Sequence, residues 1–298
     1  MRANQPYDAR PEPEELSEEG FLLTAQNMLM CGEGSKSAQW IQNEKAKDRE
    51  PLETTELSFD VEEAMNSGIF VSGTSGCGKN TLAFWLTRKL IEHGVIVFVI
   101  DPSQTWKNNR DIESVLTIPQ SDKPIRVDWR AESTIFDISM LYVRNQRKFV
   151  NAFCGEVFNK ATHGFKPNVF VWLEDAELYV PNNSLRSNDT QELLRLIGCG
   201  RNYNIRYGLI TKFSAMVDKL VIKLCKQRFF GWSNEKNDLT YLKGFLGDRS
   251  SELGDLQVGE FLYSYSGKIA KVKTERFDKA QLRGYQYLYT TPTQIINQ

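Results

Sequence analysis

The sequence is poor in the residues that build metal centres and disulfide frameworks. Its 298 residues include only two histidines, His93 and His163, and these lie far apart. A histidine-based metal centre and a Ser-His-Asp triad are therefore unsupported. The five cysteines are odd in number and form no C-x-x-C pair. This favours reduced thiols over a disulfide framework or a zinc site.

Long apolar segments are also missing. The longest strand-like run, residues 95–100, is far shorter than the roughly 20 residues of a membrane-spanning helix. The first residues carry Arg2 and then acidic side chains in place of the apolar stretch of a secretory signal. We therefore expect no membrane span and a cytoplasmic location.

Charge is unevenly distributed along the chain, although the formal net charge is only −1. Residues 1–65 hold 15 acidic and 6 basic side chains, which leaves 23 acidic and 31 basic side chains on the remainder. The acidic head is also rich in proline and polar residues, which predicts an irregular arm over residues 1–55. We expect one folded domain over residues 56–280 and a tail over residues 281–298.

Short apolar runs alternate with helical periodicity after residue 68, which is typical of an α/β fold with a mainly parallel sheet flanked by helices. Near the end, alternating aromatic residues precede Ser266-Gly267, which predicts a β-hairpin with a two-residue turn. The expected strands cover residues 69–71, 95–100, 134–138, 169–173, 207–211 and 229–230. The expected helices cover residues 80–93, 149–158, 191–197, 217–224 and 239–245.

A glycine-rich loop lies between the first expected strand and the first expected helix. It has the pattern G-x-x-x-x-G-K, in which backbone N–H groups and a helix N-terminus surround phosphate oxygens and the lysine reaches the β- and γ-phosphates. The sequence thus predicts a nucleotide-phosphate site. Its residues are Gly73, Thr74, Ser75, Gly76, Cys77, Gly78, Lys79, Asn80 and Thr81.

One position in this loop departs from the usual pattern. The residue after the lysine is ordinarily Ser or Thr, whose hydroxyl binds Mg²⁺, whereas this chain has Asn80. An amide oxygen is also a Mg²⁺ ligand, but it is bulkier and lies further from the backbone. We therefore expect nucleotide binding to tolerate this change better than hydrolysis does.

Two adjacent carboxylates, Glu174 and Asp175, follow the apolar strand at residues 169–173. An apolar strand that ends in two acids is the Walker B form, in which one carboxylate holds Mg²⁺ and the next polarises the attacking water. We assign Glu174 to the metal and Asp175 to the water. The usual order is Asp then Glu, and the shorter Asp175 has less reach for the role of base.

Four segments follow one another along the chain: GTSGCGKNT at residues 73–81, VFVIDP at 97–102, WLEDAE at 172–177 and GRNYNIRYGLITKFS at 200–214. In this order they resemble the P-loop core of the HerA/FtsK superfamily of DNA-pumping ATPases, which includes viral genome-packaging ATPases. The resemblance covers about residues 57–277 and implies a RecA-like fold, ATP and Mg²⁺ as ligands, double-stranded DNA as partner and a homo-oligomeric, hexameric ring.

The resemblance also implies roles for two basic residues. The family places a glutamine that senses the γ-phosphate where this chain has Lys212, and Lys is a point charge rather than an amide that orients water. Arg201 lies where the family has arginines near a subunit boundary. It is either a finger that stabilises the transferring phosphoryl group in trans or an arginine at the surface or on the phosphate backbone of the nucleic acid. The departures at Asn80, Glu174–Asp175 and Lys212 all affect the hydrolytic residues, so slow or absent turnover stays an alternative to the expected ATPase activity.

Four groups of residues are candidates for contact with the DNA backbone. We expect a compact motor of genome packaging or of a mobile element, in the host cytoplasm or the virion if the source is viral. A portal, capsid, membrane vertex or nuclease is a possible protein partner. The candidate DNA-contacting groups are the loop 107–110, the loop 182–188, the lysines and arginine at 219, 223, 226 and 228, and the lysines and arginine at 268, 271, 273 and 276.

Three other functions stay open from the sequence. A nucleotide-binding assembly factor would bind ATP and oligomerise without pumping DNA. A HerA-like translocase would act in DNA processing. A kinase-like phosphotransferase would be a monomer with an acceptor pocket.

Overall fold

The computed structural model describes residues 55–56, 59–107, 109, 112–120, 127, 129–164, 167–182 and 190–274. The predicted tail at residues 281–298 lies outside these residues, and so does the predicted arm at residues 1–55 apart from Thr55. Most of the loop 182–188, two residues of the loop 107–110 and Arg276 lie outside them as well.

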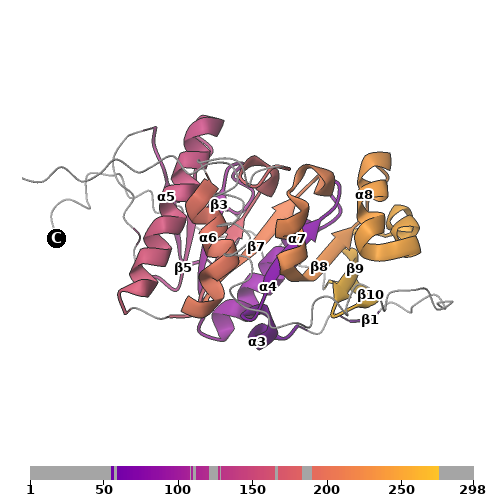
Figure 1. Cartoon of the computed structure of the whole chain (residues 1–298), viewed down its shortest axis with the longest axis horizontal. Helices are drawn as coiled ribbons and strands as arrows, with labels where there is room; N and C mark the ends of the chain where they lie inside the picture. The colour runs from indigo at the N-terminus through magenta and orange to yellow at the C-terminus, as the bar shows by residue number, and fades with distance from the viewer. Residues whose placement is uncertain are drawn as a thin grey trace, which may run out of the picture.

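A single sheet of ten strands runs through the described part of the chain (Figure 1). Neighbouring strands are parallel except where β9 pairs with β8 and β10. Across the sheet the order is β1 (Thr55–Glu56), β10 (Lys268–Lys273), β9 (Glu260–Tyr265), β8 (Cys225–Gly231), β2 (Gly68–Ser72), β7 (Ile205–Thr211), β6 (Val169–Leu173), β3 (Ile96–Asp101), β5 (Ser133–Asp137) and β4 (Ser114–Thr117).

Helices cover both faces of the sheet, so the central strands are buried on both sides. Phe98 of β3 packs in one core cluster, whereas Val97 and Val99 pack in the other. This explains why the apolar runs are continuous rather than alternating. One face carries α5 (Val143–Thr162), α6 (Gln191–Cys199), α7 (Lys219–Leu224) and α8 (Lys236–Leu246), and the other carries α3 (Val61–Ala64) and α4 (Lys79–Glu92). Short 3₁₀ helices are η1 (Ala176–Leu178), η4 (Gly200–Tyr203), η5 (Ser214–Met216) and η6 (Gly247–Asp255).

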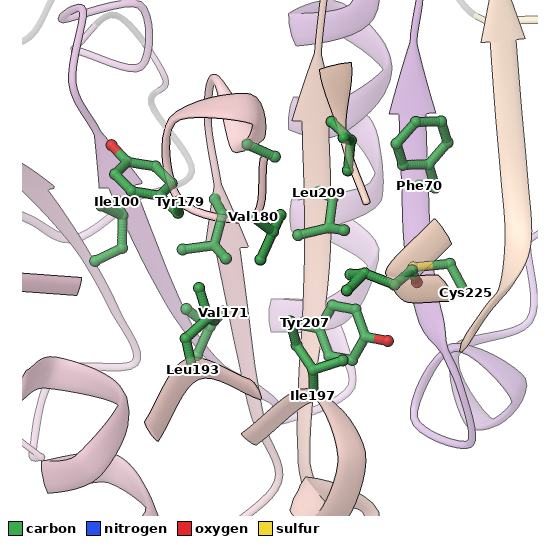
Figure 2. Packing of buried hydrophobic residues seen from close by; sticks show 14 of the residues in the cluster. Phe70, Ile100, Val171, Tyr179, Val180, Leu193, Ile197, Tyr207, Leu209 and Cys225 are labelled. Atoms are coloured by element: carbon green, nitrogen blue, oxygen red, sulfur yellow. The ribbon is translucent and has the colours of Figure 1, made fainter. Parts of the chain in front are cut away.

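The core between α6 and the sheet shows how one helix is fixed in place (Figure 2). Leu193 and Ile197 of α6, one turn apart, lie beside Val171 of β6 and Tyr207 of β7 respectively. All four side chains are nearly or completely buried. No helix in the described part of the chain is long and apolar enough to cross a membrane.

The predicted α/β architecture is confirmed, together with the six strands and five helices that the sequence predicted. The C-terminal hairpin is confirmed as well: Ser266 and Gly267 both have positive φ, as a tight turn between β9 and β10 requires. The edge strand β4 was not predicted. Its residues are alternately half-buried and exposed, so no apolar run marks it.

The position of β7 between β2 and β6 brings the two predicted motifs to one edge of the sheet. Gly208 pairs with Ile69 of β2 and with Trp172 of β6. A Cβ atom at residue 208 would lie 2.2 Å from the Trp172 ring and 2.9 Å from the Phe170 ring. Glycine is therefore required here for β7 to fit beneath these rings.

Gly208→Ala should destabilise the protein by about 1–3 kcal/mol, because the added methyl group forces the buried indole of Trp172 to move. Chemical denaturation measures this loss. Gly254→Ala is the matched control, since its Cβ would meet no atom within 4 Å. Equal stability of the two variants would contradict this account of the sheet.

Candidate nucleotide-binding site

The loop between β2 and α4 has the backbone shape that its glycines predict. Gly73, Gly76 and Gly78 have φ angles of 143°, 87° and 106°. A Cβ atom on Gly78 would lie 3.1 Å from the backbone N of Gly259, which donates a hydrogen bond to the Cys77 carbonyl. Glycine thus permits both the turn and its close contact with the chain before β9.

Helix α4 begins directly at this loop and presents its N-terminus there. Gly78 is the N-cap and no side chain caps the helix, so backbone N–H groups of the first turn remain available for an anion. The Lys79 side chain is buried, and its Nζ donates hydrogen bonds to the carbonyls of Gly73 (2.7 Å) and Thr74 (3.1 Å). Asn80 and Thr81 are half-buried in the same turn.

Cys77 is a packing residue of the loop. Its thiol is buried, and its Sγ occupies the space next to Gly73 and Gly231. Burial raises the pKa of this thiol despite the opposing charge of Lys79. A protonated, buried thiol is unreactive, so the structure gives no support to a redox role.

Glu174 lies at the carboxyl end of β6 and is only 3% exposed. Its Oε2 accepts a hydrogen bond of 2.9 Å from the indole Nε1 of Trp106. Burial raises the pKa of Glu174 to about 7, with smaller contributions from the charges of Asp175 and Asp101, while the indole N–H lowers it. This carboxylate is thus strongly biased toward accepting a proton or a cation.

Asp175 adopts a left-handed backbone conformation with φ of 50°, which places it next to the end of β7. Its Oδ1 lies 3.2 Å from Nζ of Lys212. The residue predicted to polarise water is therefore held in an ion pair by the residue at the predicted phosphate-sensing position. The sequence showed both residues but not that they are paired.

Further polar residues at this edge escaped the sequence interpretation. Thr211 donates a hydrogen bond of 2.7 Å to Glu177, whose pKa burial raises. The hydroxyl of Tyr179 is buried and has no hydrogen-bond partner among the described residues; it points away from the aliphatic cluster in Figure 2. The Asp101 carboxylate accepts a hydrogen bond of 2.8 Å from the backbone N–H of Trp106 in the turn after β3. Asp101, Glu177 and Thr211 lie in the segments that resemble the HerA/FtsK core, but the sequence assigned a role to none of them.

The structure does not bring Arg201 to this site. It lies in η4, just before β7 begins, and is exposed. The loop, Glu174 and Lys212 all follow the carboxyl ends of their strands, so the seven residues of β7, roughly 23 Å long, separate Arg201 from them. Within one chain, Arg201 cannot contact a nucleotide bound at the loop.

The basic residues predicted to contact DNA are partly engaged in the fold. Lys271 pairs with Glu260 at 2.9 Å, and Lys219 lies 5.6 Å from the centre of the Tyr241 ring. Arg228 lies 5.4 Å from the Phe245 ring. The side chains of Lys107, Lys223, Lys226, Lys268 and Lys273 are exposed.

The carboxylates fit a Mg²⁺ ion that arrives with a nucleotide. Mg²⁺ in such sites is held by one or two carboxylates together with phosphates and water. Glu174 supplies a buried carboxylate next to other acids whose charges a divalent cation would offset. No group of three or more His, Cys, Asp or Glu side chains in the described residues is arranged to hold a metal.

No protein-family model and no curated protein sequence matches the chain. The structure is similar to that of the genome packaging NTPase B204 from Sulfolobus turreted icosahedral virus 2, with a TM-score of 0.54 and 13% identity over 71% of this chain and 98% of that chain. It is also similar to VirB4 of Thermoanaerobacter pseudethanolicus, with a TM-score of 0.56 and 12% identity over 72% and 91% of the two chains. The chain has the P-loop NTPase fold of these proteins. The predicted P-loop NTPase fold is thereby confirmed. A further B204 structure contains ATP-gammaS.

The raised pKa of Glu174 predicts a pH-dependent stability. The folded state keeps this proton up to about pH 7, whereas the unfolded chain loses it near pH 4.3. The resulting stabilisation is present below pH 4.3 and is lost as the pH rises through about 7. Glu174→Gln keeps an acceptor for Trp106 and does not titrate.

Denaturation of both proteins in chelator between pH 5 and pH 8 measures this effect. The free energy of unfolding of the wild type should fall relative to that of Glu174→Gln by on the order of 2 kcal/mol. A difference that does not change with pH would contradict the assignment.

Proposed function

We propose that the protein is a motor that hydrolyses ATP and translocates double-stranded DNA during packaging of a viral or mobile-element genome. The observation that carries this proposal is the convergence of Lys79, the buried Glu174 and the Asp175–Lys212 pair at one edge of the sheet. The similarity to B204, a genome packaging NTPase that binds ATP-gammaS, supports it.

The proposed roles follow from the positions of the side chains. The N-terminus of α4 would bind the phosphates, and the Lys79 ammonium would turn from its carbonyl contacts to the β- and γ-phosphates. Glu174 and Asn80 would hold Mg²⁺, which neutralises charge on the phosphates when bound. Asp175 would orient the attacking water.

The ion pair between Asp175 and Lys212 gives this reaction a proposed order of events. The Lys212 ammonium lies 3.2 Å from Oδ1 of Asp175 and so occupies one of the two carboxylate oxygens. If Lys212 contacts the γ-phosphate, it leaves Asp175 and frees that oxygen for water. Nucleotide binding would then expose the base only when a γ-phosphate is present.

A ring would supply the groups that one chain lacks at the site. Because Arg201 lies at the opposite edge of the sheet, it would stabilise the transferring phosphoryl group only from a neighbouring subunit, as in a hexamer. The exposed Lys107, Lys223 and Lys268 are candidates for contact with the DNA backbone. Such a motor would work in the cytoplasm or the virion, with a portal, capsid, membrane-vertex or nuclease partner.

The same ion pair also favours a second candidate function, a nucleotide-binding assembly factor with slow or no turnover. A base held by Lys212, together with Asn80 in place of Ser or Thr, would weaken hydrolysis more than binding. ATP binding without turnover, with or without DNA, would support this alternative. Recovery of turnover in Asn80→Ser would identify Asn80 as the cause.

Steady-state ATP hydrolysis with and without duplex DNA tests the motor. Turnover should rise with DNA, and this stimulation should weaken with salt because phosphate contacts release counterions.

Lys79→Ala should lower turnover by about 100-fold or more, since it removes the charge that faces the phosphates. Lys89→Ala on the same helix, whose lysine pairs with Glu92 near the surface, is the matched control. ATP binding without DNA-stimulated turnover in the wild type would contradict the proposal that the protein is a motor.

A further inference from the structure

The turn after β3 is organised around one buried carboxylate. Asp101, at the end of β3, accepts hydrogen bonds from the backbone N–H groups of Ser103 (3.0 Å), Thr105 (3.2 Å) and Trp106 (2.8 Å). These bonds fix the path of residues 102–106 next to the carboxyl end of β6. The backbone of Trp106 is therefore tied to the Asp101 carboxylate.

The Trp106 side chain is fully buried between the two elements that carry the nucleotide motifs. Its ring centre lies 4.8 Å from that of Phe84 on α4 and 6.1 Å from that of Trp172 on β6. Its indole N–H donates the 2.9 Å hydrogen bond to Oε2 of Glu174. A single side chain thus contacts the helix behind the phosphate loop and the predicted metal-binding carboxylate.

The hydrogen bond determines how Glu174 is presented. An indole N–H only donates, so it holds one carboxylate oxygen and leaves the other for a cation. We propose that Trp106 is a positioning residue that orients Glu174 for the Mg²⁺–nucleotide and ties the turn at residues 102–107 to occupancy of this site. The inference rests on the proposed function, in which Glu174 holds Mg²⁺.

The turn also connects the site to the surface. Lys107 follows Trp106 directly and is exposed, and the Trp106 carbonyl accepts a hydrogen bond of 2.8 Å from the backbone N–H of Asn109. A movement of the Glu174 carboxylate upon Mg²⁺ binding would shift the indole, and the shift would reach Lys107 through the backbone. Trp106 is thereby a link between the nucleotide and a residue proposed to contact DNA.

A matched pair of variants isolates the hydrogen bond. Trp106→Phe removes the N–H but keeps a buried ring. Trp172→Phe makes the same chemical change in a neighbouring buried indole whose Nε1 has no acceptor within the described part of the chain. Replacement of Trp106 by benzothienylalanine, which keeps the bicyclic ring and lacks the N–H, serves if Trp106→Phe does not fold.

The affinity for a fluorescent ATP analogue, measured with Mg²⁺ and with chelator, is the first measurement. The gain in affinity that Mg²⁺ gives should fall about 10-fold or more in Trp106→Phe, as expected for loss of a partner of a metal ligand, and should persist in Trp172→Phe. Affinity in chelator should be unchanged. Hydrogen exchange of residues 102–107 should respond to the Mg²⁺–nucleotide in the wild type and in Trp172→Phe but not in Trp106→Phe.

The outcomes separate this inference from the proposed function. If the wild type binds the analogue and both tryptophan variants keep the Mg²⁺ gain, or lose it equally, Trp106 has no positioning role. If the wild type does not bind the analogue, the proposed function fails and the inference fails with it.

Discussion

The parallel alignment of β2, β7 and β6 is the constraint on which the candidate site depends. The strand that carries Thr211 and Lys212 can lie between the strand of the phosphate loop and the strand of Glu174 only because residue 208 has no side chain beneath the Trp172 ring. Since all three strands point the same way, their carboxyl ends meet at one edge. A motif after any one of them is then within reach of the others.

Electrostatics at this edge follows from the same geometry. Burial raises the pKa values of Glu174 and Asp101, and neighbouring carboxylates raise them further: Asp175 and Asp101 act on Glu174, and Asp137 acts on Asp101. Polar contacts offset the repulsion between these carboxylates. The indole N–H of Trp106 donates to Glu174, backbone N–H groups donate to Asp101, and the Lys212 ammonium pairs with Asp175. These contacts are weaker than a divalent cation would be, which is why the edge is suited to a Mg²⁺–nucleotide.

The fold, the phosphate loop and the Walker B strand could be predicted because each depends on residues that are contiguous in the sequence. The continuous apolar strand at residues 169–173 and the glycines of the phosphate loop are contiguous in sequence, and the structure confirms their secondary structure. The edge strand β4 has no such pattern, because it is half-exposed. Pairings between distant residues could not be predicted either. Trp106 approaches Glu174, and Lys212 approaches Asp175, only because the strand order brings their loops together.

The most direct test of the account is an electron-microscopy structure of the protein with duplex DNA, Mg²⁺ and a non-hydrolysable ATP analogue. The account predicts a ring around the duplex, with the phosphates at the N-terminus of α4 and the Lys79 ammonium on them instead of on the carbonyls of Gly73 and Thr74. It also predicts Mg²⁺ next to Glu174, with Trp106 still hydrogen-bonded to that carboxylate. A nucleotide bound elsewhere, or Mg²⁺ held without Glu174, would contradict the central claim.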